Sequence, residues 1–337
     1  GEYLNNRKPK DVKFVSNIEE DLSRRDFTIN AMAYSPYLGF KDCFNGKEDL
    51  KNKLIRCVGD PDKRFSEDAL RMLRAIRFSC QLNFKIEKLT AESIRKNFKL
   101  VKNISMERIQ SEFTKIILSN EPDRGLMLLR KLGFSDFLVK EFKNLKLINC
   151  YDLYDDIHDT YGLINSLPKK LHVRLAGLFY KVFNSENAVE KCRTILKKLK
   201  YDNNTINDTC NLVENINSIS CNMTRKKLKL LINSVGTENI FDLLDLQKSY
   251  LSYMDEYDTE CIDILKNRVS DILASKEPIF IKDLAITGND LITELNYKPG
   301  KNIGVILNFL LENVMQTPEL NNKEDLLNLS KQFYSYN

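Results

Sequence analysis

The stretch of sequence that decides the fold is RFSEDALRMLRAIRF, which runs from Arg64 to Phe78. Its apolar residues recur every three positions, as they do on the buried face of an amphipathic helix. These residues are Leu70, Leu73 and Ile76. Ser66 stands immediately ahead of the acidic Glu67 and is of a type that caps helix N-termini. The stretch therefore predicts an amphipathic helix that begins at Ser66.

Three arginines of the same stretch, Arg71, Arg74 and Arg77, recur at every third position. They would share one face of the predicted helix, where like charges repel one another slightly. This face is either simply solvated or turned toward an anion such as a triphosphate or an RNA backbone, which guanidinium groups bind well. The second interpretation makes a phosphorylated ligand the natural partner.

Asp68 and Arg71 would lie one helical turn apart, so that their side-chain ends can reach the same object. A carboxylate accepts hydrogen bonds and a guanidinium donates them. Cytosine and adenine present a donating amine beside an accepting ring nitrogen, whereas uracil and guanine carry the reverse order. The pair therefore predicts selection of C and A without a nucleic-acid template, because a mispaired base would leave buried polar groups unsatisfied.

Upstream, the block DLSRRDFTINAMA begins at Asp21 and contains the consecutive charged residues Arg24, Arg25 and Asp26. By themselves these three residues could form a surface ion cluster that contributes little energy. Around this block lie short β-type runs, which we predict as strands. They cover residues 12–15, 27–34 and 39–44. So few strands do not close a sheet, and we expect further strands of the same domain upstream of the first residue.

Downstream of residue 60 the pattern is almost entirely helical. Ser105 followed by Glu107 predicts the start of another helix, which continues to Ile117. Two polar stretches, Asn149–Asp159 and Ser275–Pro278, are predicted to join separate modules.

These blocks resemble the motifs of class II CCA-adding tRNA nucleotidyltransferases and of the similar bacterial poly(A) polymerases. The resemblance lies in RRDFTINAMA, in the connector from Asp42 to Gly46, in EDL at 48–50, in IRCVG ending at Gly59, in EDALR, and in SMERI from Ser105. In order and spacing these motifs cover residues 3–120. A looser similarity continues to the C-terminus.

The resemblance implies a predominantly α-helical, multi-domain fold with an N-terminal remnant of an α/β nucleotidyltransferase head. The head remnant would occupy residues 1–48 and a nucleotide-selecting neck residues 49–148. A helical body would occupy residues 149–274 and a tRNA-binding tail residues 275–337.

The resemblance also implies which side chains bind CTP and ATP. Arg25 would contact the incoming nucleotide. Asp68 and Arg71 would read its base edge, and Arg74 and Arg77 would help to hold its phosphates. Second-tier candidates, the last two of them near the ribose, are Arg24, Asp26 and Asn30. Residues expected to support the site without contacting the ligand are Glu67, Glu107 and Arg108.

Members of the family carry an earlier block with a Gly-Gly loop and D-x-D carboxylates that hold two magnesium ions, and this sequence has no such block. Phosphoryl transfer depends on such metals. We therefore assign no catalytic residue and no metal ligand here, expect the Mg²⁺ carboxylates upstream of Gly1, and expect the chain alone to be inactive. Asp60-Pro61-Asp62 has the letters of D-x-D, but Pro61 and Gly59 predict a turn before a helix.

Two further stretches bear on function by the same resemblance. Leu175–Lys181 has no His-Asp ligand pair, so the phosphohydrolase activity of some relatives is not expected, and His158 is expected in a solvated charge cluster. In the tail, Lys298 and Lys301 flank Gly300 in a turn that opens a helix, whose N–H groups could receive a phosphate of tRNA. An ordinary Pro-Gly turn is the alternative.

The composition excludes several classes of protein. Hydrophobic residues make up 42% and charged residues 29% of the 337 residues, and no apolar run is long enough to span a bilayer. Without a secretory signal, a cytoplasmic location is expected. The eight cysteines form no C-x-x-C pair and there are only two histidines, so we predict free core thiols and no zinc site. The net charge of +5 suits a polyanionic partner such as tRNA, and a homo-oligomer stays open.

The leading hypothesis is therefore addition of CCA to the tRNA 3′ end from CTP and ATP. Within the same class, a poly(A) polymerase or an enzyme that adds only CC or only A stays open. A rival from another class is a non-catalytic tRNA-binding fragment. A scaffold that binds no nucleotide ranks last.

Overall fold

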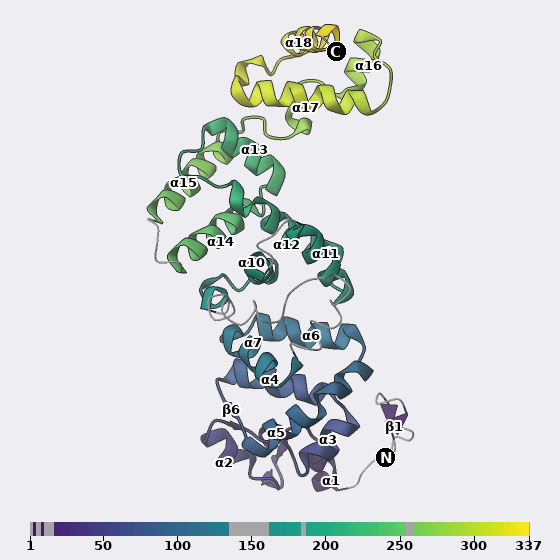
Figure 1. Cartoon of the computed structure of the whole chain (residues 1–337), viewed down its shortest axis with the longest axis vertical. Helices are drawn as coiled ribbons and strands as arrows, with labels where there is room; N and C mark the ends of the chain where they lie inside the picture. Colours follow the sequence, from purple (N-terminus) through teal and green to yellow (C-terminus); the bar gives the residue numbers. More distant parts are fainter. Residues whose placement is uncertain are drawn as a thin grey trace. The chain divides into compact units, whose positions relative to one another are not determined.

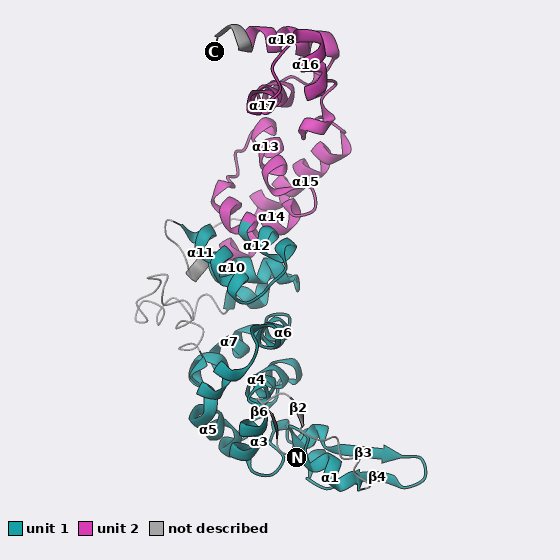
Figure 2. Cartoon of the chain, turned by 90° about the vertical axis from the view of Figure 1, so that its right-hand side faces the viewer, with its two compact units in different colours: residues 1–210 teal, residues 211–337 magenta. Residues whose placement is uncertain are grey.

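Helices supply almost all of the secondary structure in the computed structural model of the chain (Figure 1). The structure describes residues 3–4, 8–9, 17–134, 162–182, 187–253 and 259–336. The chain divides into two compact units, residues 1–210 and residues 211–337 (Figure 2). The prediction of a predominantly α-helical chain is confirmed, whereas the four predicted domain ranges stay a prediction.

The strands that the structure describes form three two-stranded sheets near the N-terminus. β1 (Tyr3–Leu4) pairs with β2 (Lys8–Pro9) in an antiparallel manner. β3 (Met32–Ser35) and β4 (Gly39–Asp42) form an antiparallel hairpin. β5 (Leu54–Ile55) pairs with β6 (Lys85–Ile86) in parallel.

Two of the predicted strands are partly confirmed. The stretch 27–34 begins as a single bridge between Phe27 and Cys57, continues as a 3-10 turn (Thr28–Asn30), and only then enters β3. The strand predicted at 39–44 ends at Asp42, because the Asp42 carboxylate accepts hydrogen bonds from backbone N–H groups between residues 44 and 47 and turns the chain. The strand predicted at 12–15 lies outside the described residues.

The first part of unit 1 also contains helices, one of which is α4 (Leu70–Leu82). The others are α1 (Ile18–Ser23), α2 (Gly46–Lys51), α3 (Pro61–Glu67), α5 (Lys88–Asn97), α6 (Met106–Ile117) and α7 (Pro122–Lys131). α4 packs against α6 and α7, and α3 packs against α5. Leu73 and Ile76 are buried as predicted, and a buried side chain of this size stabilises the fold by about 1.5–3 kcal/mol. The helix predicted after Ser105 is confirmed as α6, with Ser105 as its N-cap.

The helix start predicted at Ser66 is wrong. Ser66 lies inside α3, where its hydroxyl donates to the Lys63 carbonyl, and the N-cap of α3 is Asp60. A proline follows Asp60 at the first helical position, which confirms the turn predicted there. α3 ends just before Asp68, whose backbone is extended with φ −149° and ψ 101°. The Asp68 carboxylate accepts a hydrogen bond from the N–H of Leu70 at 3.1 Å and so caps α4.

Unit 1 continues with α10 (Leu171–Val182), α11 (Ala188–Lys198) and the first part of α12 (Asn203–Asn215). α10 packs against α6 and against α11. Arg174 of α10 is buried, and its guanidinium donates to the carbonyls of Ile117, Ser119 and Leu167. Carbonyls at the end of α6 carry partial negative charge, so they stabilise this buried cation although burial lowers the pKa of Arg174.

Unit 2 consists of further helices and short 3-10 turns. The helices are α13 (Arg225–Val235), α14 (Ile240–Tyr253), α15 (Glu260–Ala274), α16 (Gly288–Leu295), α17 (Lys301–Gln316) and α18 (Lys323–Tyr336). α13 packs against α14, α15 and α17. The polar joint predicted at Ser275–Pro278 follows the end of α15, and the joint predicted at Asn149–Asp159 lies outside the described residues. Among the described residues, every helix is too short or too polar to cross a bilayer.

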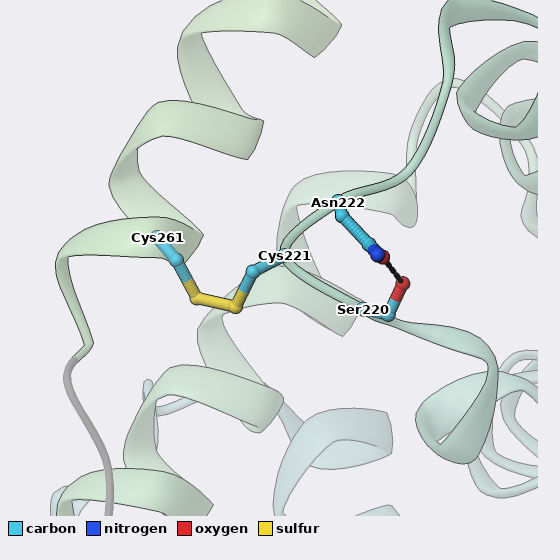
Figure 3. Close-up of a disulfide and its surroundings, with 4 residues drawn as sticks. All are labelled: Ser220, Cys221, Asn222 and Cys261. Carbon is cyan, nitrogen blue, oxygen red and sulfur yellow. Dashed lines mark hydrogen bonds between the residues drawn. A yellow bond between two sulfur atoms is a disulfide. The ribbon is translucent and has the colours of Figure 1, made fainter.

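A disulfide joins Cys221, which precedes α13, to Cys261 in the first turn of α15 (Figure 3). The prediction that all the cysteines are free thiols is therefore wrong for this pair. The two residues are 40 positions apart in the sequence, and only the packing of α13 to α15 brings their Cα atoms to 5.4 Å, within the range that a disulfide spans. The other cysteines that the structure describes carry no disulfide.

Candidate functional site

A cleft of about 570 Å³ opens in unit 1 where the segment after α1 meets α4 and α6. Small-molecule ligands bind in clefts of about 300–1,000 Å³. Side chains from the RRDFTIN block line one part, namely Arg24, Arg25, Asp26 and Asn30. The rest is lined by Asp68, Leu70, Arg71, Arg74, Phe78 and Arg108. The fold thus brings together most of the predicted site residues.

Cations outnumber anions around this cleft. Five guanidinium groups and two carboxylates line it. Such an excess of positive charge in a concave site attracts anions, and guanidinium groups match the geometry of phosphate oxygens. The electrostatics of the cleft therefore suit a phosphorylated ligand.

Asp26 holds Arg74 in a fixed orientation. The Arg74 Nε and Nη2 atoms both lie close to one Asp26 carboxylate oxygen, at 2.7 and 2.6 Å. The other oxygen accepts from the Phe27 backbone N–H at 3.0 Å and from the Asn30 side chain at 3.1 Å. Asp26 is only 7% exposed, so a charge-assisted contact of this kind is strong. Among the described residues no contact engages Nη1 of Arg74, and this atom can donate to a ligand.

Arg71 is held from three sides. Its Nη1 donates to the Glu67 carboxylate at 3.0 Å and to the Arg64 carbonyl at 3.2 Å. Its Nη2 donates to the Arg24 carbonyl at 2.7 Å, across 47 residues of sequence. These bonds use three of the five N–H groups, which fixes the guanidinium plane and leaves donors for a ligand in the cleft.

Asp68 lies beside Arg71, although not in the way that the sequence predicted. The expectation of two residues one turn apart on a single helix is wrong, because Asp68 precedes α4 and caps it. Its second carboxylate oxygen accepts from Arg108 Nη2 at 2.8 Å. Each carboxylate oxygen keeps a further lone pair. An acceptor and a donor therefore still face the same cleft.

Arg24 and Arg25 are the more exposed cations of the cleft. Each pairs with an acidic residue one turn earlier in α1, Arg24 with Glu20 and Arg25 with Asp21. The Arg25 side chain is 55% exposed, and exposed pairs of this kind contribute about 0.2–1 kcal/mol. Both guanidinium groups can exchange these partners for a ligand at little cost.

Arg77 does not line the cleft. Its Nε lies 2.7 Å from Glu112 of α6, and its side chain is only 11% exposed. Six residues turn a helix by about 600°, which places Arg77 about 120° away from Arg71 around α4. The prediction that the three arginines share one face is therefore wrong for Arg77. Burial lowers its pKa, and the Glu112 carboxylate counteracts this effect.

The residues expected to support the site divide into three cases. Glu67 accepts a hydrogen bond from Arg71 and does not line the cleft. Arg108 lines the cleft itself, whereas Glu107 is exposed and does not line it. Sequence analysis did not single out Phe78, although Phe78 is four positions after Arg74 and thus on the same helical face.

The predicted tRNA contact lies in unit 2, at the start of α17. Gly300 has φ +152° and precedes this helix, and Lys298 and Lys301 beside it are exposed. The first N–H groups of a helix have no intrahelical partner and can bind an anion. The geometry is compatible with either interpretation of the turn.

The part of the chain that the structure describes offers no metal site. It contains no group of three or more His, Cys, Asp or Glu side chains that could hold a metal ion. Asp60 and Asp62 are engaged instead: Asp60 caps α3, and Asp62 accepts hydrogen bonds from Ser93 and Asn97 of α5. Leu175–Lys181 lies in α10, and His158 lies outside the described residues.

A helical chain with a cleft lined by five guanidinium groups and two carboxylates suits a protein that binds nucleotides. Comparison with known families agrees. Residues 1–56 match the poly A polymerase head domain, and residues 83–146 match the probable RNA and SrmB-binding site of polymerase A. Residues 178–329 match the putative domain 2 of tRNA nucleotidyltransferase.

Individual relatives define the family more closely. The CCA-adding enzyme of Ligilactobacillus salivarius is 34% identical over 98% of this chain and 75% of its own length. That of Pediococcus pentosaceus is 34% identical over 97% and 76%. The crystal structure of the Bacillus stearothermophilus CCA-adding enzyme in complex with CTP superposes with a TM-score of 0.73 at 26% identity, over 96% and 76%. The chain belongs to the family of CCA-adding enzymes.

Proposed function

We propose that the chain serves the addition of C, C and A to the 3′ end of tRNA, with CTP and ATP as substrates. The observation that carries this proposal is the pair of Asp68 and Arg71 in a cleft lined by five guanidinium groups. An acceptor beside a donor fits the edge shared by cytosine and adenine. Curated relatives carry the name CCA-adding enzyme, and one solved relative is in complex with CTP, which supports the same substrates.

The other side chains of the cleft receive roles from their free donors. The triphosphate is held by Arg74, whose Nη1 is free to donate, and by the exposed Arg25. Arg24 lies beside them. Asn30 and Asp26 lie near the ribose. Arg108 orients the Asp68 carboxylate through its 2.8 Å contact.

The remaining supporting residues act from outside the cleft. Glu67 holds the guanidinium of Arg71 in place. Arg77 pairs with Glu112 and so supports α4 from outside the cleft. Glu107 lies in the first turn of α6 and stabilises the start of this helix. In the tail, Lys298, Gly300 and Lys301 bind the tRNA backbone. An enzyme of this kind works in the cytoplasm, where tRNA is its substrate.

Magnesium is the metal that this reaction class uses, and it would neutralise the triphosphate. The described residues do not fit such an ion, so no step of the reaction is assigned to a metal here. We therefore attribute nucleotide selection, not metal binding, to the residues of this chain.

Equilibrium binding of the four nucleoside triphosphates to the chain tests the selection. We expect CTP and ATP to bind at least about tenfold more tightly than UTP and GTP, because a wrong base leaves a buried donor or acceptor unpaired. Equal affinity for all four would contradict the proposal. Binding of none of them would favour a scaffold.

Incorporation separates the remaining alternatives. The chain is incubated with tRNA lacking its 3′ CCA, Mg²⁺ and labelled CTP and ATP. Ordered C, C and A addition supports a complete enzyme, and long tails of A alone identify a poly(A) polymerase. Addition of only CC or only A identifies a partial enzyme. Selective binding without incorporation is expected of the chain alone. Mixing the chain with a separately expressed nucleotidyltransferase head then distinguishes part of an enzyme, which gains CCA addition, from a non-catalytic tRNA-binding protein, which does not.

A further inference from the structure

Phe78 lies in the cleft and has no role in the proposed selection of the base. Its ring is half-buried and meets the ring of Phe27 edge to face, with centroids 5.8 Å apart and planes at 82°. Phe27 is fully buried, and such aromatic pairs are stabilising beyond the area that they bury. The Phe78 ring is therefore held firmly at the wall of the cleft.

Two guanidinium groups lie over this ring. The Arg74 guanidinium carbon is 5.4 Å from the ring centroid, and that of Arg77 is 4.1 Å away. A cation within about 6 Å of an aromatic face is attracted to it. Arg77 pairs with Glu112, so the ring contacts one cation that is held outside the cleft and one that faces it.

From this geometry we infer that Phe78 is a positioning residue for Arg74. Asp26 holds the Nε and Nη2 side of the Arg74 guanidinium, and the Phe78 ring restricts its remaining rotation. Together they present Nη1 to the cleft. This inference rests on the proposed function, in which Arg74 binds the triphosphate.

A role through Arg74 has a specific consequence for ligands. The triphosphate is common to CTP and ATP, whereas the base edge is read by Asp68 and Arg71. Loss of the Phe78 ring should weaken binding of both nucleotides equally and leave the preference over UTP and GTP unchanged. A ring that packed under the base would change the preference instead.

The test measures binding of CTP, ATP and cytidine to Phe78→Leu, Phe78→Tyr and the wild-type chain. We expect Phe78→Leu to weaken CTP and ATP binding by about three- to tenfold, the effect of losing one cation–π contact in a partly desolvated site. Phe78→Tyr, which keeps the ring, should bind like wild type. Cytidine binding should not change. Leu82→Ala, at an exposed position of α4 outside the cleft, is the matched control.

A second arm tests the link to Arg74 directly. In an Arg74→Gln background, Phe78→Leu should have no further effect on CTP binding, because the group that it positions is gone. Should Phe78→Leu lower the melting temperature, Phe78→Met, which keeps most of the volume without the ring, replaces it.

Two outcomes would overturn the inference: an equal loss of cytidine binding, or an undiminished effect in the Arg74→Gln background. Failure of the proposed function is visible separately, since the wild-type chain would then show no preference for CTP and ATP.

Discussion

Two clusters of charged side chains, one in each unit, use their charges in opposite ways. In the cleft of unit 1, Arg71 and Arg74 each donate some of their N–H groups to the protein and have others free for a ligand. In unit 2, Lys229 is fully buried, pairs with Glu277 and donates to the Met315 carbonyl at 3.1 Å. Free N–H donors mark the first cluster, whereas in the second cluster a single carboxylate pairs with two cations.

The two clusters differ in the number of side-chain donors that remain free for a ligand. Glu277 accepts from both Arg225 and Lys229, and these contacts, with that to Arg225 the strongest, hold the pKa of Glu277 down at about 2. Such a cluster joins α13 to the segment after α15 and to the end of α17. The cluster in unit 2 thus joins parts of the fold, whereas the cleft in unit 1 keeps free donors that, in our proposal, bind a ligand.

The largest expected effect concerns the structural cluster. Replacing Glu277 with Ala leaves the buried Lys229 ammonium without its carboxylate, which should cost about 3–5 kcal/mol of unfolding free energy. Urea unfolding of the variant measures this loss. Glu238→Ala, at an exposed position of the same unit, should change stability by less than about 0.5 kcal/mol. An unaltered midpoint for Glu277→Ala would show that the cluster contributes nothing.

Reduction of the disulfide in unit 2 should have a similar effect. Its loop of 40 residues restricts the unfolded chain, and release of such a loop should cost about 4 kcal/mol. Thermal unfolding with and without dithiothreitol measures this, and Cys221→Ser should unfold at the same temperature under both conditions. CTP binding in unit 1 should not respond to the reductant. A change in CTP affinity on addition of dithiothreitol would contradict the view that the disulfide of unit 2 has no part in nucleotide binding by unit 1.

Next in size is the loss of Arg71 or Asp68, which we propose to read the edge of the base. Arg71→Ala should weaken CTP binding by about 2–3 kcal/mol, or about 30- to 150-fold, because charged hydrogen bonds in a partly buried site are lost. Asp68→Ala should reduce the preference for CTP and ATP over UTP and GTP. Titration calorimetry with the four nucleotides checks both variants. Arg95→Ala on α5, outside the cleft, should bind like wild type, and unchanged selectivity in both cleft variants would end the proposal.

Acid should weaken the structural cluster in a defined range of pH. The Glu277 pKa is lowered from an ordinary 4.5 to about 2, so the folded state binds its proton less readily than the unfolded state. The stabilisation is complete above pH 4.5 and is lost as the pH falls toward 2. Between pH 7 and pH 3 this single group should account for about 2 kcal/mol of lost stability. To measure this loss, the free energy of unfolding is determined as a function of pH for wild type and for Glu277→Gln. The difference between the two curves is the contribution of the Glu277 carboxylate.

The smallest effect is expected at the tail. Lys298→Ala and Lys301→Ala should each lower tRNA affinity a fewfold and reduce the slope of log K against log salt by about 1, as for one lost phosphate contact. Filter binding over a range of salt concentrations measures the slope. Lys282→Ala, also exposed in the tail, is the control. A slope that is unaltered in all three variants would favour the ordinary Pro-Gly turn.

The sequence by itself determined the local features of this protein. The period of Leu70, Leu73 and Ile76 predicted α4, and Ser105 predicted the start of α6, because periodicity and capping depend on residues a few positions apart. For the same reason the donor and acceptor pair was visible: Asp68 and Arg71 are three positions apart. The family motifs carried the identification, since their order along the chain is itself a property of the sequence.

Only the tertiary structure decided which of these side chains share one cleft. Arg71 reaches the Arg24 carbonyl across 47 residues, Arg74 reaches Asp26 across 48, and Arg108 reaches Asp68 across 40. The turn of α4 directs Arg77 to Glu112, and the packing of unit 2 brings Cys221 to Cys261. Contacts of this span depend on how several helices pack at once, which no local pattern encodes.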